Sequence, residues 1–218
     1  MIKDGSLRVV LALGTAQTLA WGSSYYLPAI LADPIAHDLG ISGNWFFAAF
    51  SASLVISGLL GPRVGRQIDR VGGRQVLCVS NLVLAGGLAL LGASTSVWTM
   101  SAAWLLLGVG MGLGLYDAAF GALGRIYGKD ARGTITGITL IAGFASTVAW
   151  PLSSLGLETI GWRDTCYAWA LAHIVLGLPL NLSLPRAEPV HVVEGRLAKP
   201  HIPIDRTMVL LSFAFAAA

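Results

Sequence analysis

Long uncharged apolar runs dominate the chain, and short charged segments separate them. A helix needs about 20 apolar residues to cross the hydrocarbon core of a bilayer. Four of the runs have the length of one span, and the run from Gln75 to Tyr116 is long enough for two. The pattern therefore predicts an all-α membrane protein with six transmembrane helices. The expected spans are Leu7–Leu31, Trp45–Gly61, Val76–Ala93, Trp98–Leu123, Ile135–Leu155 and Tyr167–Leu184.

The chain changes composition after the sixth predicted span. Residues 185–206 are rich in proline, histidine and charge, which is typical of a linker outside the membrane. The apolar stretch 207–218 is about 12 residues long and too short to cross the bilayer. We therefore expect a six-helix transmembrane domain over 1–184, a cytoplasmic central linker over 185–206, and the beginning of a truncated seventh helix over 207–218.

The composition of the chain is typical of a membrane-spanning protein. The chain is 55% hydrophobic, with a mean hydropathy of +0.72 and only 11% charged residues, which is more apolar than a water-soluble domain needs to be. The net charge of +3 does not indicate a nucleic-acid partner, because the basic residues alternate with the spans and form no basic face laced with aromatic residues. The lipid bilayer is the partner that this composition predicts.

The basic residues also predict the orientation. If the spans alternate in direction, thirteen of the fourteen Lys and Arg residues lie on one side of the membrane, and only Arg163 lies on the other. The positive-inside rule then places the N-terminus and the segments 63–74, 125–132 and 185–206 in the cytoplasm. We expect a multi-pass protein of the cell (inner) membrane.

Residues 63–74 read "RVGRQIDRVGGR" and hold four arginines, one aspartate and three glycines. The segment falls between the second and third predicted spans, where it is expected to form a loop. It resembles the signature loop of the major facilitator superfamily, in which the usual pattern has a second basic residue where this chain has Gly73. The positions that match are Gly65, Asp69, Arg70, Gly72 and Arg74.

This resemblance implies a fold and a mechanism. The chain is similar to the N-terminal six-helix half of a transporter whose two halves bind a small-molecule substrate near the membrane midplane. The loop would be a conformational latch that contacts the other half, which is either a missing C-terminal six-helix half or a second copy. Gly65 would let two helix ends approach closely, and Asp69 would form contacts that break when the conformation changes. The alternative is that the arginines only set the orientation.

Polar and aromatic residues inside the spans are candidates for the substrate or proton pathway. Gln17, Trp21 and Tyr25 recur every four residues and share one face of the first span, and similar transporters line their cavity with the first and fourth spans. Asp117 is the only acid well inside a span, which suits proton coupling or substrate pairing, a structural ion pair, or a water-exposed vestibule. The remaining candidates are Arg125 and Trp150, while Tyr25 also fits an interfacial aromatic belt.

Other features of the spans favour packing. Gly108 and Gly112 share one face of the fourth span, and Gly110 and Gly114 share another, which predicts close helix crossings. His173 is expected to be a packed, hydrogen-bonded helix residue rather than a proton relay. Many related transporters carry an arginine at the position of Trp104. The role of that arginine would therefore be absent here or performed by another residue.

The sequence therefore favours a secondary active transporter of a small solute. Candidate substrates are small organic anions, amphiphiles and neutral metabolites, and two segments faintly resemble the carboxylate porters of the superfamily. No cofactor and no metal ion are expected, and no phosphate-binding loop indicates coupling to ATP. An intramembrane enzyme would need facing catalytic partners, whereas one Asp and one His lie on different spans, so an enzyme is not expected. The remaining alternative is a non-transporting membrane scaffold or a dimerising half-transporter.

Overall fold

The computed structural model describes residues 4–186, and this part of the chain contains helices and no strand. The predicted seventh helix and nearly all of the linker lie outside the described residues. The elements in chain order are α1 (Asp4–Ser23), α2 (Pro28–Asp38), α3 (Gly43–Val71), α4 (Gly73–Gly92), α5 (Val97–Gly114), α6 (Tyr116–Tyr127), the 3-10 turn η1 (Gly128–Asp130), α7 (Ala131–Ala142), α8 (Ala145–Ala172), the π-helical segment η2 (His173–Gly177) and α9 (Leu178–Leu182).

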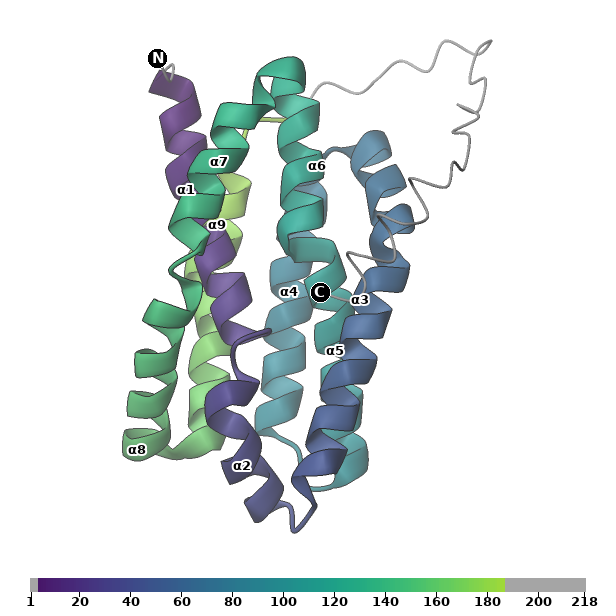
Figure 1. The fold of residues 1–218 in the computed structure, drawn as a ribbon, viewed down its shortest axis with the longest axis vertical. Coiled ribbons are helices and arrows are strands. Elements are labelled where there is room, and N and C mark those ends of the chain that lie inside the picture. Colours follow the sequence, from purple (N-terminus) through teal and green to yellow (C-terminus); the bar gives the residue numbers. More distant parts are fainter. Residues whose placement is uncertain (1–3, 187–218) are drawn as a thin grey trace, which may run out of the picture.

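The helices run side by side as an elongated bundle (Figure 1). Element α4 lies in its interior, since it packs against α5, α8, α6, α3 and α9, while α1 packs along α7 and α8. Within residues 4–186, the helical stretches long and apolar enough to cross a membrane are Gly43–Val71, Gly73–Gly92 and Val97–Leu182. This confirms an all-helical membrane protein. The count of six transmembrane helices and the cytoplasmic N-terminus stay predictions.

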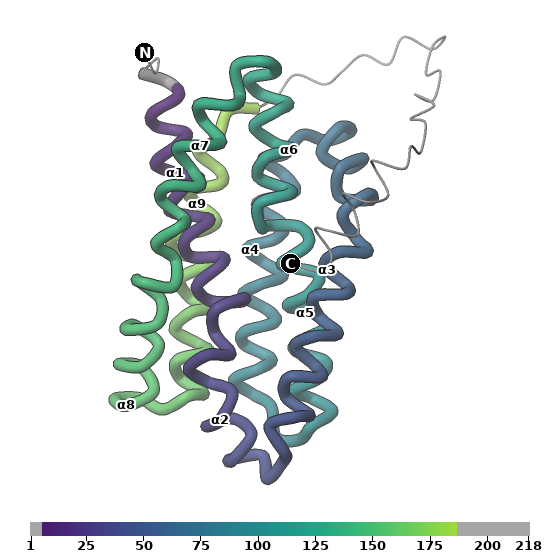
Figure 2. Tube along the Cα trace, viewed as in Figure 1, coloured from purple at the N-terminus to yellow at the C-terminus, as the bar shows by residue number. Residues whose placement is uncertain are grey.

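The two ends of the bundle differ in which segments they carry. The tube in Figure 2 places the start of α1, the α3–α4 turn and the α6–α7 connection at the upper end, and the α2–α3 and α4–α5 connections at the lower end. Segments predicted to share one side of the membrane therefore share one end of the bundle. The sequence rule and the fold agree on this grouping.

The predicted loop of residues 63–74 is wrong in its secondary structure. Helix α3 continues through Val71, and Gly72 alone separates it from α4. Gly72 has φ +89° and ψ 148°, a conformation that glycine adopts without the steric penalty that a Cβ atom brings. The chain therefore reverses direction at one residue, and most of the basic motif lies on helix rather than loop.

The first and fourth predicted spans are interrupted. Between Ser23 and Pro28 the chain leaves the helix, because Pro28 has no N–H group to donate to the carbonyl oxygen of Ser24 four residues earlier. Helix α5 ends at Gly114, and the extended Leu115 (φ −80°, ψ −167°) joins it to α6. Such breaks leave backbone groups that other parts of the protein must satisfy inside a membrane.

Glycines permit close crossings of α5 with two neighbours, which confirms the expected packing role. A Cβ atom on Gly108 would lie 2.5 Å from the carbonyl oxygen of Ser53 on α3. A Cβ atom on Gly110 would lie 2.7 Å from the Leu84 side chain on α4. The faces of Gly112 and Gly114 contact α3 and α4 in the same way. Small residues at this spacing let helix backbones approach closely.

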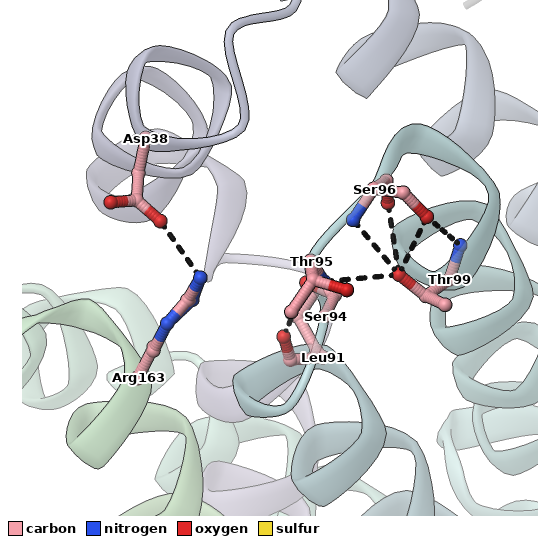
Figure 3. Close-up of polar contacts among 7 residues, drawn as sticks. All are labelled: Asp38, Leu91, Ser94, Thr95, Ser96, Thr99 and Arg163. Atoms are coloured by element: carbon pink, nitrogen blue, oxygen red, sulfur yellow. Dashed lines mark hydrogen bonds and ion pairs between the residues drawn. The ribbon is translucent and has the colours of Figure 1, made fainter.

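A polar contact joins α2 to α8 at the lower end of the bundle. Arg163 lies 2.9 Å from Asp38 and stacks over the ring of Trp162, while a capping box between Ser96 and Thr99 begins α5 nearby (Figure 3). The chain reaches Arg163 through Gly161, whose φ of +80° breaks the helix inside α8. Arg163 is the basic residue that the positive-inside rule places on the side of the membrane opposite to the other Lys and Arg residues. In the structure it forms an ion pair that links α8 to α2.

Candidate functional site

The predicted latch residues lie where α3 passes into α4. Gly65, Asp69 and Arg70 occupy the last turns of α3, Gly72 forms the turn, and Arg74 is in the first turn of α4. All except Gly72 and Arg74 are exposed. The helix end therefore presents charge and an open glycine rather than a packed surface.

The structure pairs Asp69 with Arg125 on α6. Their side chains approach to 3.9 Å, and the exposed fraction is 74% for the Asp69 side chain against 11% for Arg125. An ion pair this long and this exposed contributes little to folding stability. Arg125, which was a pathway candidate, thus lies beside the latch, and Asp69 keeps most of its carboxylate surface free for a second contact.

Gly65, which was expected to let two helix ends approach closely, makes no such approach within the described residues, so its role stays a prediction. A Cβ atom on Gly65 would meet no described atom within 4 Å. A Cβ atom on Gly73 would instead collide with the Cβ of Ala122 and lie 2.6 Å from its Cα. The departure from the usual basic residue at Gly73 therefore has a physical reason, because α4 begins in contact with α6.

Gln17 connects α1 to the break between α5 and α6. Its side-chain Nε2 donates a hydrogen bond of 2.6 Å to the carbonyl oxygen of Gly114, the last residue of α5. Gln17 is only 1% exposed, so this bond forms without competition from solvent. The side chain satisfies a backbone oxygen at the interruption, as a broken helix in a membrane requires.

Aromatic side chains gather beside this bond. Trp21 has ring centroids 4.9 Å from Tyr116, 5.2 Å from Tyr25 and 6.2 Å from Tyr26. The group extends through ring contacts to α3 and α8. We call this set the aromatic cluster; its members are Trp21, Tyr25, Tyr26, Phe50, Tyr116 and Trp150.

The cluster joins segments that are far apart in the sequence. Trp150 donates a hydrogen bond of 3.2 Å from its indole Nε1 to the carbonyl oxygen of Tyr26, in the break between α1 and α2. Tyr25 and Trp150 are 41% and 43% exposed, while Trp21, Tyr26 and Tyr116 are half-buried. The breaks in the first and fourth predicted spans therefore meet at one aromatic surface that is open on one side.

Two buried polar atoms at this surface have no hydrogen-bond partner among the described residues. They are Oε1 of Gln17 and Nε1 of Trp21, one helical turn apart on α1. Burial of a polar atom without a partner is unfavourable by roughly 1–3 kcal/mol. Native proteins pair most such atoms, so each exception calls for a physical explanation.

Asp117 lies in the first turn of α6, directly after Tyr116 of the cluster. It is exposed and forms no ion pair with any residue between 4 and 186. A carboxylate near a helix N-terminus is stabilised by the backbone N–H groups there. The structure brings Arg125 to Asp69 rather than to Asp117.

Trp104 fills a fully buried position and contacts Phe46 and Phe50, at ring-centroid distances of 5.4 Å and 5.1 Å. This apolar setting explains why an arginine does not fit there in this chain, since an unpaired buried charge is strongly unfavourable.

A buried polar network holds the lower part of α1. The Asn81 amide donates to the Leu77 carbonyl oxygen, which leaves its Oδ1 to accept from Nδ1–H of His173 at 2.9 Å. The Ser23 hydroxyl lies 2.8 Å from the other nitrogen of His173 and completes the link. His173 is thus a packed, hydrogen-bonded residue, as expected.

Sequence reasoning missed several residues of this site. Tyr116 and Phe50 join the aromatic cluster, and Asn81 joins the histidine network, but none has a spacing signal in its own span. The Gly114 carbonyl oxygen is a backbone group that no residue pattern reports. Tyr116 sits next to Asp117, and that adjacency was the available signal.

The fold and these features define a helical membrane protein, and comparison with known proteins identifies its family. The profile described as Major Facilitator Superfamily matches residues 13–218. The chain belongs to the major facilitator superfamily. It is therefore a membrane protein of a transporter family, as the resemblance of the 63–74 segment implied.

Two relatives show how much of a whole transporter the chain matches. The "Putative sugar transporter ERD6-like 13" of Arabidopsis thaliana is 30% identical over 166 residues, which cover 74% of this chain and 33% of that protein. The "Uncharacterized MFS-type transporter YhhS" of Escherichia coli K12 is 26% identical over 154 residues, which cover 70% of this chain and 38% of that protein. The chain thus spans between a third and two fifths of the relatives it matches.

Proposed function

We propose that this chain is the N-terminal half of a secondary active transporter that moves a small solute across the cell (inner) membrane by alternating access. Family membership supports transport, and the aromatic cluster carries the proposal, because it joins two interrupted spans at one open surface. Helices broken at a solute site are a recurring feature of secondary transporters. Enzymatic activity is not proposed, since the family and the relatives are transporters.

The latch residues support a second part of the proposal. Asp69 is held loosely by Arg125 and keeps most of its surface exposed, so it is available to a second six-helix half or a second copy of the chain. A contact that forms in one conformation and breaks in the other can bias the equilibrium between them. Arg70 and Arg74 would keep this end of the bundle on the cytoplasmic side.

The substrate pathway is proposed to run along α1, α6 and α8. Gln17, Trp21 and Tyr25 would contact the solute from α1, and Trp150 would contact it from α8. Asp117 would add a negative charge near this path and would serve as a proton or cation partner. An organic anion is the less favoured substrate, because the nearest charge in the sequence to the cluster is this carboxylate and would repel it.

A non-transporting scaffold remains the alternative, because the chain matches only part of each relative. The two functions differ in what they require of Asp69. Transport through a latch needs the carboxylate, whereas a scaffold needs only the orientation that the arginines provide.

The experiment is uptake by the full-length protein in proteoliposomes, using radiolabelled D-glucose, D-glucuronate and D-glucosamine together with a wider set of amino acids and carboxylates. We expect flux of at least one solute, and a strong loss of that flux in Asp69→Asn with normal membrane insertion. Asp130→Asn changes another exposed acid at the same end of the bundle and serves as the control. Absence of uptake for every solute contradicts the transporter proposal. Undiminished uptake in Asp69→Asn contradicts the latch.

A further inference from the structure

The orientation of the Gln17 amide is fixed by its partner. The carbonyl oxygen of Gly114 can only accept a hydrogen bond, so the NH₂ group of Gln17 must face it. The oxygen of the same amide, Oε1, therefore lies on the other side of the side chain. It is buried, and no described residue donates to it. Gln17 thus offers an unused acceptor from a residue that is 1% exposed.

Trp21 offers an unused donor one turn further along α1. Its indole Nε1–H is buried and has no acceptor among the described residues. The ring itself contacts Tyr25, Tyr26 and Tyr116, so its position is set from several sides. Residues four apart on a helix lie on the same face, so the side chains of Gln17 and Trp21 project from one face of α1.

The chemistry of this pair selects the group that satisfies both atoms. A hydroxyl group both donates and accepts hydrogen bonds, so a hydroxylated solute satisfies Gln17 Oε1 and Trp21 Nε1 through one hydroxyl or through two. A carboxylate cannot donate to Oε1, and an ammonium group cannot accept from Nε1. A neutral hydroxylated solute therefore fits where either ion leaves one atom unpaired.

The surrounding rings fit the same class of solute. The cluster supplies aromatic faces from α1, α3, α6 and α8, against which the C–H surface of a saturated ring packs. Within residues 4–186 the cation that stacks on an aromatic ring is Arg163 on Trp162, which is not part of the cluster. The cluster thus offers apolar area beside the unpaired acceptor of Gln17 and the unpaired donor of Trp21, and no cation among residues 4–186 stacks on its rings.

We propose that Gln17 and Trp21 form a hydroxyl-binding subsite within the aromatic cluster, and that the solute is a neutral polyhydroxylated compound with a ring of the size of a hexose. This inference rests on the proposed function, since it names the substrate class of the same pathway. Gln17 fixes the subsite to the α5–α6 break, and Trp21 supplies both the donor and a packing surface.

The test compares two tryptophan variants in the purified full-length protein. Trp21→Phe keeps an aromatic ring and removes the Nε1 donor. Trp162→Phe makes the same change at a buried tryptophan of α8 that has no ring contact with the aromatic cluster among the described residues. Binding is measured by equilibrium dialysis with labelled D-glucose, D-glucuronate and D-glucosamine, which share a pyranose ring and differ in charge.

We expect D-glucose to bind more tightly than either charged analogue. We expect Trp21→Phe to weaken D-glucose binding by roughly 2- to 10-fold, the effect of one lost neutral hydrogen bond, and Trp162→Phe to leave it unchanged. Equal effects of the two variants overturn the subsite, and so does a preference for either charged sugar or no binding of any of the three sugars.

Binding and uptake separate this inference from the proposed function. If D-glucose binds through Trp21 but no tested solute accumulates in proteoliposomes, the subsite stands and transport is contradicted. If a charged solute accumulates and neutral sugars do not bind, transport stands and the subsite is overturned.

Discussion

The side-chain amide of Gln17 donates a hydrogen bond of 2.6 Å to the carbonyl oxygen of Gly114, although 97 positions separate the two residues. This bond closes the one place where α5 and α6 are not continuous. It ties the first predicted span to the fourth, which are the spans that carry most of the aromatic cluster. The bond thus links the two segments that hold most of the cluster, beside the ring contacts and the Trp150 hydrogen bond.

We predict that Gln17→Leu lowers the free energy of unfolding by about 1–3 kcal/mol, because the buried Gly114 carbonyl oxygen loses its partner. The measurement is thermal unfolding of the full-length protein in detergent. Gln75→Leu, which changes an exposed glutamine on α4, is the matched control. Equal unfolding temperatures for the two variants would show that the bond does not support the break.

Much of the fold could be predicted from the sequence because lipid imposes a simple rule on it. The lengths of the uncharged runs predict the spans, and the positions of the arginines predict which span ends lie on the same side of the membrane. The interruption at 24–27 was missed because only the length of the apolar run was considered, although Pro28 marks it in the sequence. The break at Leu115 could not be predicted this way, because an apolar run does not record where a helix breaks. The continuation of α3 through Val71 was also missed, because the charged residues of the 63–74 segment were taken to indicate a loop outside the membrane.

The candidate site was predictable only in part. Gln17, Trp21 and Tyr25 share a helical face, and that periodicity found them. Asn81 lies on another helix, and its contact with His173 depends on how α4 packs. Contacts between distant segments follow from packing geometry, which a single sequence does not display.

The start of α4 offers a prediction about the motif itself. Gly73→Arg restores the basic residue that is usual at this position of the family, yet we expect it to reduce the amount of folded protein. The reason is that its Cβ would collide with Ala122, and forcing atoms into a packed contact is unfavourable by roughly 1–3 kcal/mol. Folded yield is measured by size-exclusion chromatography in detergent.

The control for this prediction is Gly65→Ala. A Cβ atom there meets no described atom within 4 Å, and alanine is a better helix former than glycine. We therefore expect unchanged or slightly higher yield. If Gly73→Arg gives as much folded protein as Gly65→Ala, then α4 and α6 can move apart at this contact without a loss of stability, which contradicts the prediction.

The histidine network predicts coupling between α1 and η2. Ser23→Ala and His173→Phe each remove one side of the same 2.8 Å hydrogen bond, so their effects on the free energy of unfolding should not add. We expect an interaction energy of about 0.5–2 kcal/mol in a double-mutant cycle measured by chemical denaturation. Thr136→Ala changes an exposed hydroxyl on α7 and should add independently to His173→Phe. Additive effects for Ser23 and His173 would contradict the network.

The ion pair of Asp69 with Arg125 allows two roles of the carboxylate to be separated. If Asp69 acts only through Arg125, then Asp69→Asn should have no further effect once Arg125→Gln is present. We predict that it does have one, because the pair is 3.9 Å long and 74% of the Asp69 side chain is exposed, which leaves the carboxylate free to contact a second half. Flux is measured in proteoliposomes for both single variants and the double variant, with unfolding temperature as the check on folding. We expect Asp69→Asn to reduce flux in both backgrounds by a similar factor, while changing the free energy of unfolding by less than about 1 kcal/mol. A loss of flux that disappears in the Arg125→Gln background would place the function of Asp69 inside this half, and the latch would then not need a partner.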